Sequence, residues 1–173
     1  MKIEGKTIGF VMTESFCVFR KTIEELKNIT KLGGKITPIK SKNSYILDTK
    51  RGKVEEFRKE IENITNTRIL HTTQDIELVE TLDIIVVAPA TENILSKLSN
   101  NIIDDVAVIA VKEHLKRERP VVLGISASDG LSSSGVNIGK LLNMKHYYFV
   151  PFKQNNPITK PYSPVFMEIG FYK

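Results

Sequence analysis

Cysteine is nearly absent from this 173-residue chain, and long apolar runs are missing altogether. The single thiol, Cys17, cannot form an internal disulfide and fits a reducing compartment. Three histidines beside one cysteine give no spacing typical of a metal site. No apolar run reaches the length that spans a bilayer, and the first residues enter a strand pattern without a signal-peptide core. The composition therefore predicts a cytoplasmic protein with no metal centre and no membrane partner.

The excess of positive charge is small and dispersed. The formal net charge is +5, and the densest basic group, within residues 112–119, is interrupted by Glu113 and Glu118. This mixture is typical of a solvated helix face, and no basic and aromatic motif accompanies it. We therefore expect no nucleic-acid partner.

Two phosphate-binding signatures are missing, the G-x-G-x-x-G fingerprint and the G-x-x-x-x-G-K-[ST] loop. The chain instead alternates short apolar runs with helical periods. The apolar runs predict strands at residues 7–12, 35–39, 69–70, 82–87, 120–125 and 147–150. The helical spacing predicts helices at residues 19–32, 54–64, 94–100, 106–115 and 136–142. This order predicts an α/β fold with a parallel sheet covered by helices on both faces.

The C-terminal segment breaks the alternation. After residue 152 the chain carries several prolines and no long helical period. We therefore expect one α/β domain over residues 1–152, followed by an extended tail over residues 153–173. The tail is expected to pack on the domain or on a neighbouring protomer.

Hydroxyl and amide side chains follow three of the predicted strands. Open α/β sheets bind ligands beyond the carboxyl ends of their strands. After the first strand, the hydroxyls of Thr13 and Ser15 could hold a phosphate beside a helix start, or merely cap that helix. Thr91 and Asn93 follow the strand at residues 82–87, and Ser126 follows the strand at residues 120–125. Since these loops leave one edge of the sheet, we expect them to form one ligand cradle.

Two single residues have both a structural and a chemical interpretation. Asp129 could cap the next helix, or act on a substrate as a base or hydrogen-bond acceptor, and the cap is favoured. Cys17 lies where a helix start could lower its pKa, but a buried, inert thiol is the commoner outcome. The histidines complete no set of nucleophile, base and acid.

Several segments resemble a known family. The letters PATENI at residues 89–94 are similar to the P-A-S-A-N-T segment of a flavoprotein superfamily, in which that segment binds FMN. The superfamily includes phosphopantothenoylcysteine decarboxylase and the lantibiotic-modifying decarboxylases. Within it, the chain most resembles the B subunits of dipicolinate synthase. That resemblance is carried by residues 9–17, 48–52, 119–129 and 149–163.

The resemblance implies a three-layer, flavodoxin-like or Rossmann-like fold and an FMN cofactor. It also implies a homo-oligomer that works with the A subunit of dipicolinate synthase, on which the NAD(P) fold resides. The reaction would oxidise a dihydrodipicolinate-type precursor, a small dicarboxylate, in the mother cell of a spore-forming bacterium. The residues expected to contact the flavin are Thr13, Ser15, Ser41, Ala90, Thr91, Asn93 and Ser126. Asp129 is the candidate for a catalytic role.

Departures from the family pattern keep two other functions open. Glu14 and Glu92 stand where the B subunits have glycine, and a carboxylate beside a phosphate is unfavourable unless it meets a cation or points away. A degenerate flavin pocket would leave the chain a structural or regulatory partner of the A subunit. The third possibility is a phosphopantothenoylcysteine-decarboxylase-like enzyme. Residues 126–129 (SASD) argue against it, because they replace the P-A-M-N motif of the decarboxylases.

Overall fold

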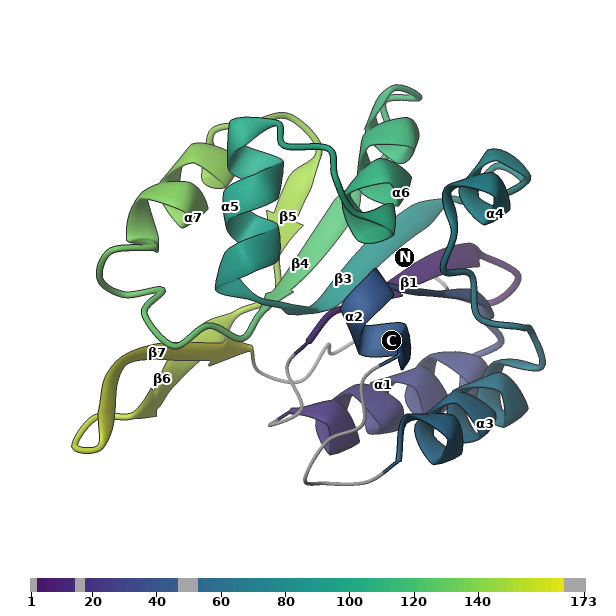
Figure 1. Cartoon of the computed structure of the whole chain (residues 1–173), viewed down its shortest axis with the longest axis horizontal. Helices are drawn as coiled ribbons and strands as arrows, with labels where there is room; N and C mark the ends of the chain where they lie inside the picture. Colours follow the sequence, from purple (N-terminus) through teal and green to yellow (C-terminus); the bar gives the residue numbers. More distant parts are fainter. Residues whose placement is uncertain (1–2, 15–17, 47–52, 167–173) are drawn as a thin grey trace.

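Five parallel strands form the central layer of the computed structural model, which describes residues 3–14, 18–46 and 53–166. They lie in the order β2-β1-β3-β4-β5 (Figure 1). Their bounds are β1 (Thr7–Met12), β2 (Lys35–Lys40), β3 (Ile84–Ala90), β4 (Val121–Ile125) and β5 (Tyr147–Phe149). The predicted parallel sheet is confirmed.

Helices cover both faces of this sheet (Figure 1). One face carries α1 (Phe19–Lys31) and α3 (Val54–Thr65). The other carries α4 (Thr73–Glu77), α5 (Glu92–Asn100), α6 (Val106–Leu115) and α7 (Gly135–Leu142). A short helix, α2 (Lys42–Ile46), follows β2. The three-layer fold is thus confirmed, and among the helices only the five-residue α2 and α4 were not predicted.

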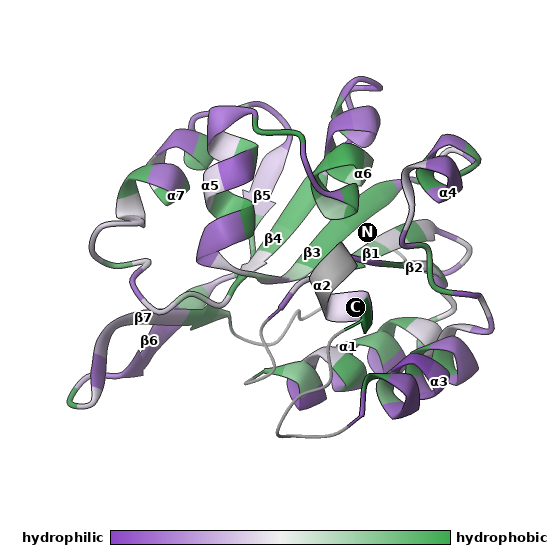
Figure 2. Ribbon diagram, viewed as in Figure 1, coloured by the Kyte–Doolittle hydropathy of each residue, from purple (hydrophilic) through white to green (hydrophobic). Residues whose placement is uncertain are grey.

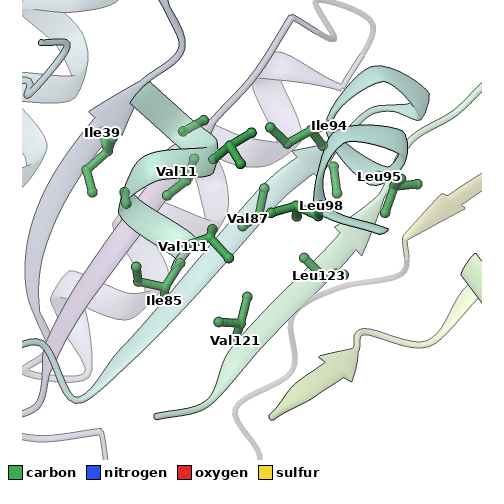
Figure 3. Packing of buried hydrophobic residues seen from close by; sticks show 14 of the residues in the cluster. Val11, Ile39, Ile85, Val87, Ile94, Leu95, Leu98, Val111, Val121 and Leu123 are labelled. Atoms are coloured by element: carbon green, nitrogen blue, oxygen red, sulfur yellow. The ribbon is translucent and has the colours of Figure 1, made fainter. Parts of the chain in front are cut away.

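The strand β3 is buried along its whole length. Ile85 and Val87 pack into the core beneath α5 and α6, near Leu98 and Val111 (Figure 3). Val86, on the other face, belongs to the core shared with α1. A strand that is covered on both faces has a continuous apolar sequence, and Figure 2 shows this run as the hydrophobic centre of the molecule.

The strand order places a topological switch point between β1 and β3. The chain leaves β1 toward β2 on one side, and then returns to add β3 on the other side. The connections that follow these two strands therefore diverge and leave a crevice at the carboxyl edge, where open α/β folds bind their ligands.

The outer edge of β2 is partly sealed by the segment that precedes α4. The Leu70 amide donates to the Pro38 carbonyl (2.9 Å), and the Lys40 amide donates to the Leu70 carbonyl (2.9 Å). Pro38 has no amide hydrogen, so it suits this edge strand. The predicted short strand at residues 69–70 is thus reduced to one parallel bridge, between Leu70 and Ile39.

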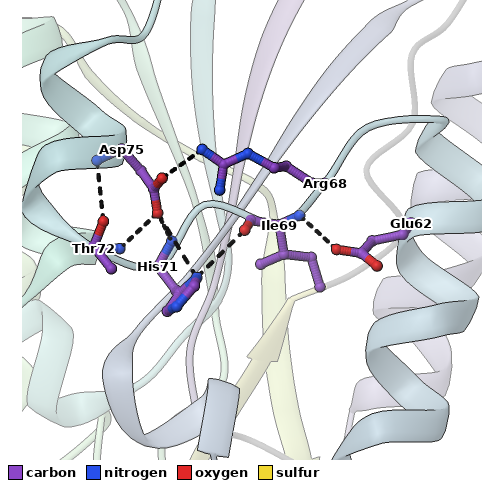
Figure 4. Close-up of polar contacts among 6 residues, drawn as sticks. All are labelled: Glu62, Arg68, Ile69, His71, Thr72 and Asp75. Carbon is purple, nitrogen blue, oxygen red and sulfur yellow. Dashed lines mark hydrogen bonds and ion pairs between the residues drawn. The ribbon is translucent and has the colours of Figure 1, made fainter.

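A polar cluster around Asp75 holds this segment in place (Figure 4). The Asp75 carboxylate accepts hydrogen bonds from the amides of His71 and Thr72 (3.1 Å each) and from the Arg68 guanidinium (2.6 Å). Thr72 accepts in return from the Asp75 amide, which completes a capping box at the start of α4. Burial opposes ionisation, but the His71 amide, Arg68 and Thr72 hold the pKa of Asp75 well below its usual range.

The chain continues beyond β5 as an antiparallel hairpin of β6 (Phe152–Asn156) and β7 (Lys160–Phe166). The hairpin projects from the sheet as an arm (Figure 1). Its base is anchored by Phe166, which is fully buried and packs against Gly124; a Cβ on that glycine would lie 3.3 Å from the ring. Residues expected to form an extended tail therefore include two paired strands, while residues 167–173 lie outside the described part.

No helix within the described ranges is both long enough and apolar enough to cross a bilayer.

Replacing Phe166 by alanine should lower the free energy of unfolding by about 3–5 kcal/mol, because the change opens a cavity beneath the hairpin. Ile158 at the tip of the hairpin is 89% exposed, so Ile158→Ala should change the free energy of unfolding by less than about 0.5 kcal/mol. Urea unfolding followed by circular dichroism measures both. Equal effects would show that Phe166 does not anchor the arm.

Asp75→Asn should lower the free energy of unfolding by about 2 kcal/mol at pH 7, because a carboxylate that accepts several hydrogen bonds is lost. The folded-state pKa of Asp75 lies below its unfolded value, so this contribution is complete above about pH 4 and disappears as the pH falls further. Urea unfolding between pH 2 and pH 7 should therefore show the two proteins converging in acid. Asp104→Asn, at an exposed position, is the control.

Candidate functional site

An open cleft of about 670 Å³ lies at the carboxyl edge of the sheet, beyond the ends of β1, β3 and β4. The loops after these strands form one wall, and the β6–β7 hairpin forms the other. The residues that line the cleft include Glu14, Thr91, Glu92, Ser126, Lys160 and Tyr162. The cleft therefore sits at the switch point that the strand order predicts.

Hydrogen bonds tie the loops after β1 and β4 to the last residues of β3. The Thr13 hydroxyl donates to the Pro89 carbonyl (2.7 Å) and lies 3.4 Å from the Thr91 hydroxyl. The Ser126 amide donates to the Ala90 carbonyl (2.9 Å). Four of the residues predicted to contact a flavin, Thr13, Ala90, Thr91 and Ser126, are thus assembled in one place. Their contact with a cofactor stays a prediction.

Ser41 extends the same group toward β2. Its amide donates to the Met12 carbonyl (3.2 Å), at the end of β1. Its hydroxyl lies 3.4 Å from a Glu14 carboxylate oxygen and 2.9 Å from the Ser44 hydroxyl. Ser44 in turn donates to Met12 (3.2 Å). This predicted residue therefore adjoins the loop after β1.

The two carboxylates that replace family glycines both line the cleft. Glu92 accepts a hydrogen bond from the Ser128 hydroxyl (2.6 Å), and Glu14 accepts the weaker one from Ser41. Each negative charge is therefore turned to a neighbouring hydroxyl. Lys160, on the hairpin, supplies positive charge in the opposite wall.

The remaining predicted residues are placed less favourably. Asn93 is exposed in the first turn of α5 and is not among the residues that line the cleft. Asp129 accepts a hydrogen bond from the Ser133 hydroxyl (2.6 Å) within its own loop, and the hydroxyls of Ser133 and Ser134 hold the pKa of Asp129 below its usual range. An ionised carboxylate of this kind is a weak base. Ser15 and Cys17 lie outside the described residues.

Comparison with known proteins agrees with this geometry. The sequence model of the Flavoprotein family matches residues 1–157. The chain belongs to the Flavoprotein family. The B subunit of dipicolinate synthase from Bacillus subtilis (strain 168) is 34% identical over 166 residues, which cover 94% of this chain and 83% of that protein. The resemblance to B subunits is therefore confirmed.

Solved structures agree with this family assignment. The crystal structure of the dipicolinate synthase B subunit from Bacillus halodurans C superposes with a TM-score of 0.87 and 35% identity, covering 97% of this chain and 88% of the other. The FMN-dependent cysteine decarboxylase SpaF superposes with a TM-score of 0.70 and 18% identity, covering 95% of this chain and 91% of that one. SpaF shares the fold.

The wall formed by the hairpin was missed in the sequence. Val165 pairs with Ser126, the Ala127 amide donates to the Pro164 carbonyl (3.2 Å), and the Ser163 hydroxyl donates to the Ala127 carbonyl (2.7 Å). These bonds place β7 against the loop after β4. The available signal was the Asn-Pro pair at residues 156–157, which marks a turn between two short segments.

Thr13→Val should lower the free energy of unfolding by about 1–3 kcal/mol, because the buried Pro89 carbonyl loses its donor. Thr13→Ser keeps the hydroxyl and should recover most of that loss. Urea unfolding of the three proteins makes the comparison. If the valine and serine variants are equally stable, the bond from Thr13 to the end of β3 does not hold the loop after β1 in place.

Proposed function

We propose that this chain binds FMN in the cleft and serves as the B subunit of a dipicolinate-forming oxidoreductase. The observation that carries the proposal is the assembly of three hydroxyl-bearing loops, represented by Thr13, Thr91 and Ser126, at the switch point of a Flavoprotein-family sheet. Similarity to the B subunit from Bacillus subtilis over nearly the whole chain supports the assignment.

The lining of the cleft suits a flavin mononucleotide. Its volume falls within the range of about 300–1,000 Å³ that is usual for small-molecule sites. Thr91 and Ser126 present hydroxyls on the loop side. Pro161, Tyr162 and Pro164 present apolar surface on the hairpin side, which suits a flat aromatic ring. A flavin bound here would supply hydride or electron transfer.

The protein itself would then hold and orient the ligand and shield it from water. The loops after β1, β3 and β4 hold the polar part of the ligand, and the hairpin limits the access of water from the other side. Lys160 in the hairpin wall is a cation available to a carboxylate of a dicarboxylate substrate. In this proposal the A subunit carries the NAD(P) site, and both act in the mother cell of a spore-forming bacterium on a dihydrodipicolinate-type precursor. A homo-oligomer of this chain belongs to the same proposal.

Flavin titration of the isolated chain tests the cofactor. Bound FMN should quench flavin fluorescence and leave the protein yellow after desalting. Glu14→Gln removes a negative charge beside the predicted phosphate loop, so it should raise the affinity for FMN by about three- to tenfold. Glu24→Gln, on the exposed side of α1, removes the same charge at a distance and should leave the affinity unchanged.

Co-expression with the A subunit tests the reaction. The isolated complex should form dipicolinate from its precursor, and omission of either protein should abolish product. If neither the chain nor the complex takes up FMN, the proposal is wrong and the chain acts as a structural or regulatory partner. Release of carbon dioxide from phosphopantothenoylcysteine would instead identify a decarboxylase.

A further inference from the structure

A second cavity, of about 220 Å³, lies between α4 and α6. These two helices cover the same face of the sheet (Figure 1). The lining includes Leu82, just before β3, and Ile85 near the start of that strand, whereas the cleft lies beyond the carboxyl ends of the strands. Among the described residues, none lines both the cavity and the cleft. The cavity is therefore separate from the proposed cofactor site.

The cavity follows from a thin place in the helix layer, because α4 has only five residues. Beneath it, Leu82 packs directly on β1, where Gly9 has no side chain; a Cβ on Gly9 would lie 2.6 Å from Leu82 Cδ1. The capping box of Thr72 and Asp75 fixes the start of α4. Packed strands and a capped helix thus bound the cavity.

The interior of the cavity is aliphatic. Ile39 of β2 and Ile85 of β3 contribute from the sheet, in the core on the α6 side (Figure 3). Ile76 of α4 and Ala110 of α6 contribute from the helices, and all four side chains are buried. An unfilled apolar cavity lacks packing contacts. Since an apolar cavity of about 150 Å³ can hold benzene, this one suits a ligand of about nine non-hydrogen atoms.

His114 adds one polar group to the α6 side of the cavity, and its side chain is buried. Its Nε2 donates to the Pro120 carbonyl (3.0 Å), which can only accept, so Nδ1 is the acceptor of the neutral ring. Burial lowers the pKa of His114 and favours that neutral form. No hydrogen bond from a described residue reaches Nδ1. A ligand N–H can therefore be accepted by this side chain.

The mouth of the cavity carries charges of both signs. Glu77 and Glu80 line it from the α4 side, and Arg117 lines it from the end of α6. None of the three takes part in an ion pair with another described residue. Glu113, which also lines the cavity, is already paired with Lys116 (2.5 Å). The two sides of the mouth thus suit a ligand that has both an ammonium and a carboxylate.

We propose that this cavity binds a free α-amino acid with a branched aliphatic side chain, such as L-leucine. Glu77 and Glu80 receive its ammonium together with His114 Nδ1, and Arg117 receives its carboxylate. An α-amino acid carries both charged groups on one carbon, so they stay at the mouth while the side chain enters the aliphatic interior. Because the cavity is separate from the cleft, the amino acid acts as an effector and not as a substrate. This inference does not depend on FMN binding.

Calorimetric titration of the full chain tests the ligand class with three probes of the same carbon skeleton. L-Leucine should bind, while isoamylamine, which lacks the carboxylate, and isocaproate, which lacks the ammonium, should each bind at least about tenfold more weakly. Arg117→Gln should lower the affinity for L-leucine about tenfold and change that for isoamylamine less than about twofold. Arg20→Gln, at an exposed position of α1, is the matched control and should change neither.

Filling the cavity provides a second test. Ala110→Leu places an aliphatic side chain inside it and should lower the affinity for L-leucine at least about tenfold. Val136→Leu, at an exposed position of α7, enlarges a side chain away from the cavity and should leave that affinity unchanged. Circular dichroism checks that both variants are folded, and Arg117→Gln changes only an exposed residue, so the test does not depend on Ala110→Leu alone.

Three results would overturn the proposal. Failure of the unsubstituted protein to bind L-leucine would remove the site, whether or not the same protein binds FMN. Equal affinities for L-leucine and isoamylamine would show that Arg117 receives no carboxylate and that the ligand is a simple amine. Undiminished binding of L-leucine to folded Ala110→Leu would place the amino acid elsewhere on the molecule.

Discussion

The burial of β3 on both faces is the constraint on which the rest of the structure depends. A strand that is covered by helices above and below is typical of the interior of a parallel sheet, and β3 lies there between β1 and β4. The three strands then end at one edge, and their following loops share that edge. The bond from Thr13 to the Pro89 carbonyl joins the loop after β1 to the end of β3 across the switch point. The core thus determines where the polar groups of the cleft meet.

The candidate site combines walls of different chemistry. Loop hydroxyls and carboxylates face a hairpin that offers proline, tyrosine and lysine. Charge also differs between the walls, because Glu14 and Glu92 lie on the loop side and Lys160 lies on the hairpin. A ligand between these walls would meet carboxylates and hydroxyls on one side, and a cation and an aromatic ring on the other. Glu14 is turned to the Ser41 hydroxyl and Glu92 to the Ser128 hydroxyl, so each carboxylate already has a polar neighbour.

Apolar patterns in the sequence predicted helices and strands correctly where the patterns were long. The helix at residues 106–115 was predicted with its observed bounds, and the strand at residues 7–12 likewise, because each carries a full apolar pattern. The five-residue helices α2 and α4 are too short for a helical period to be recognised. The capping box of Thr72 and Asp75 was the local signal for α4. The β6–β7 hairpin was not predicted, because its pairing depends on contacts with the loop after β4.

The sequence by itself determined the layers, the convergence of the loops and the family, because apolar periodicity and loop chemistry are properties of neighbouring residues. Only the tertiary structure decided which polar residues face the cleft. Asn93 and Asp129 follow the correct strands, yet one is exposed and the other bonds within its own loop. Lys40 directly follows the predicted strand at residues 35–39, and only the folded structure shows that this lysine is 3% exposed. Side-chain direction and burial depend on residues distant in the chain, so periodicity cannot report them.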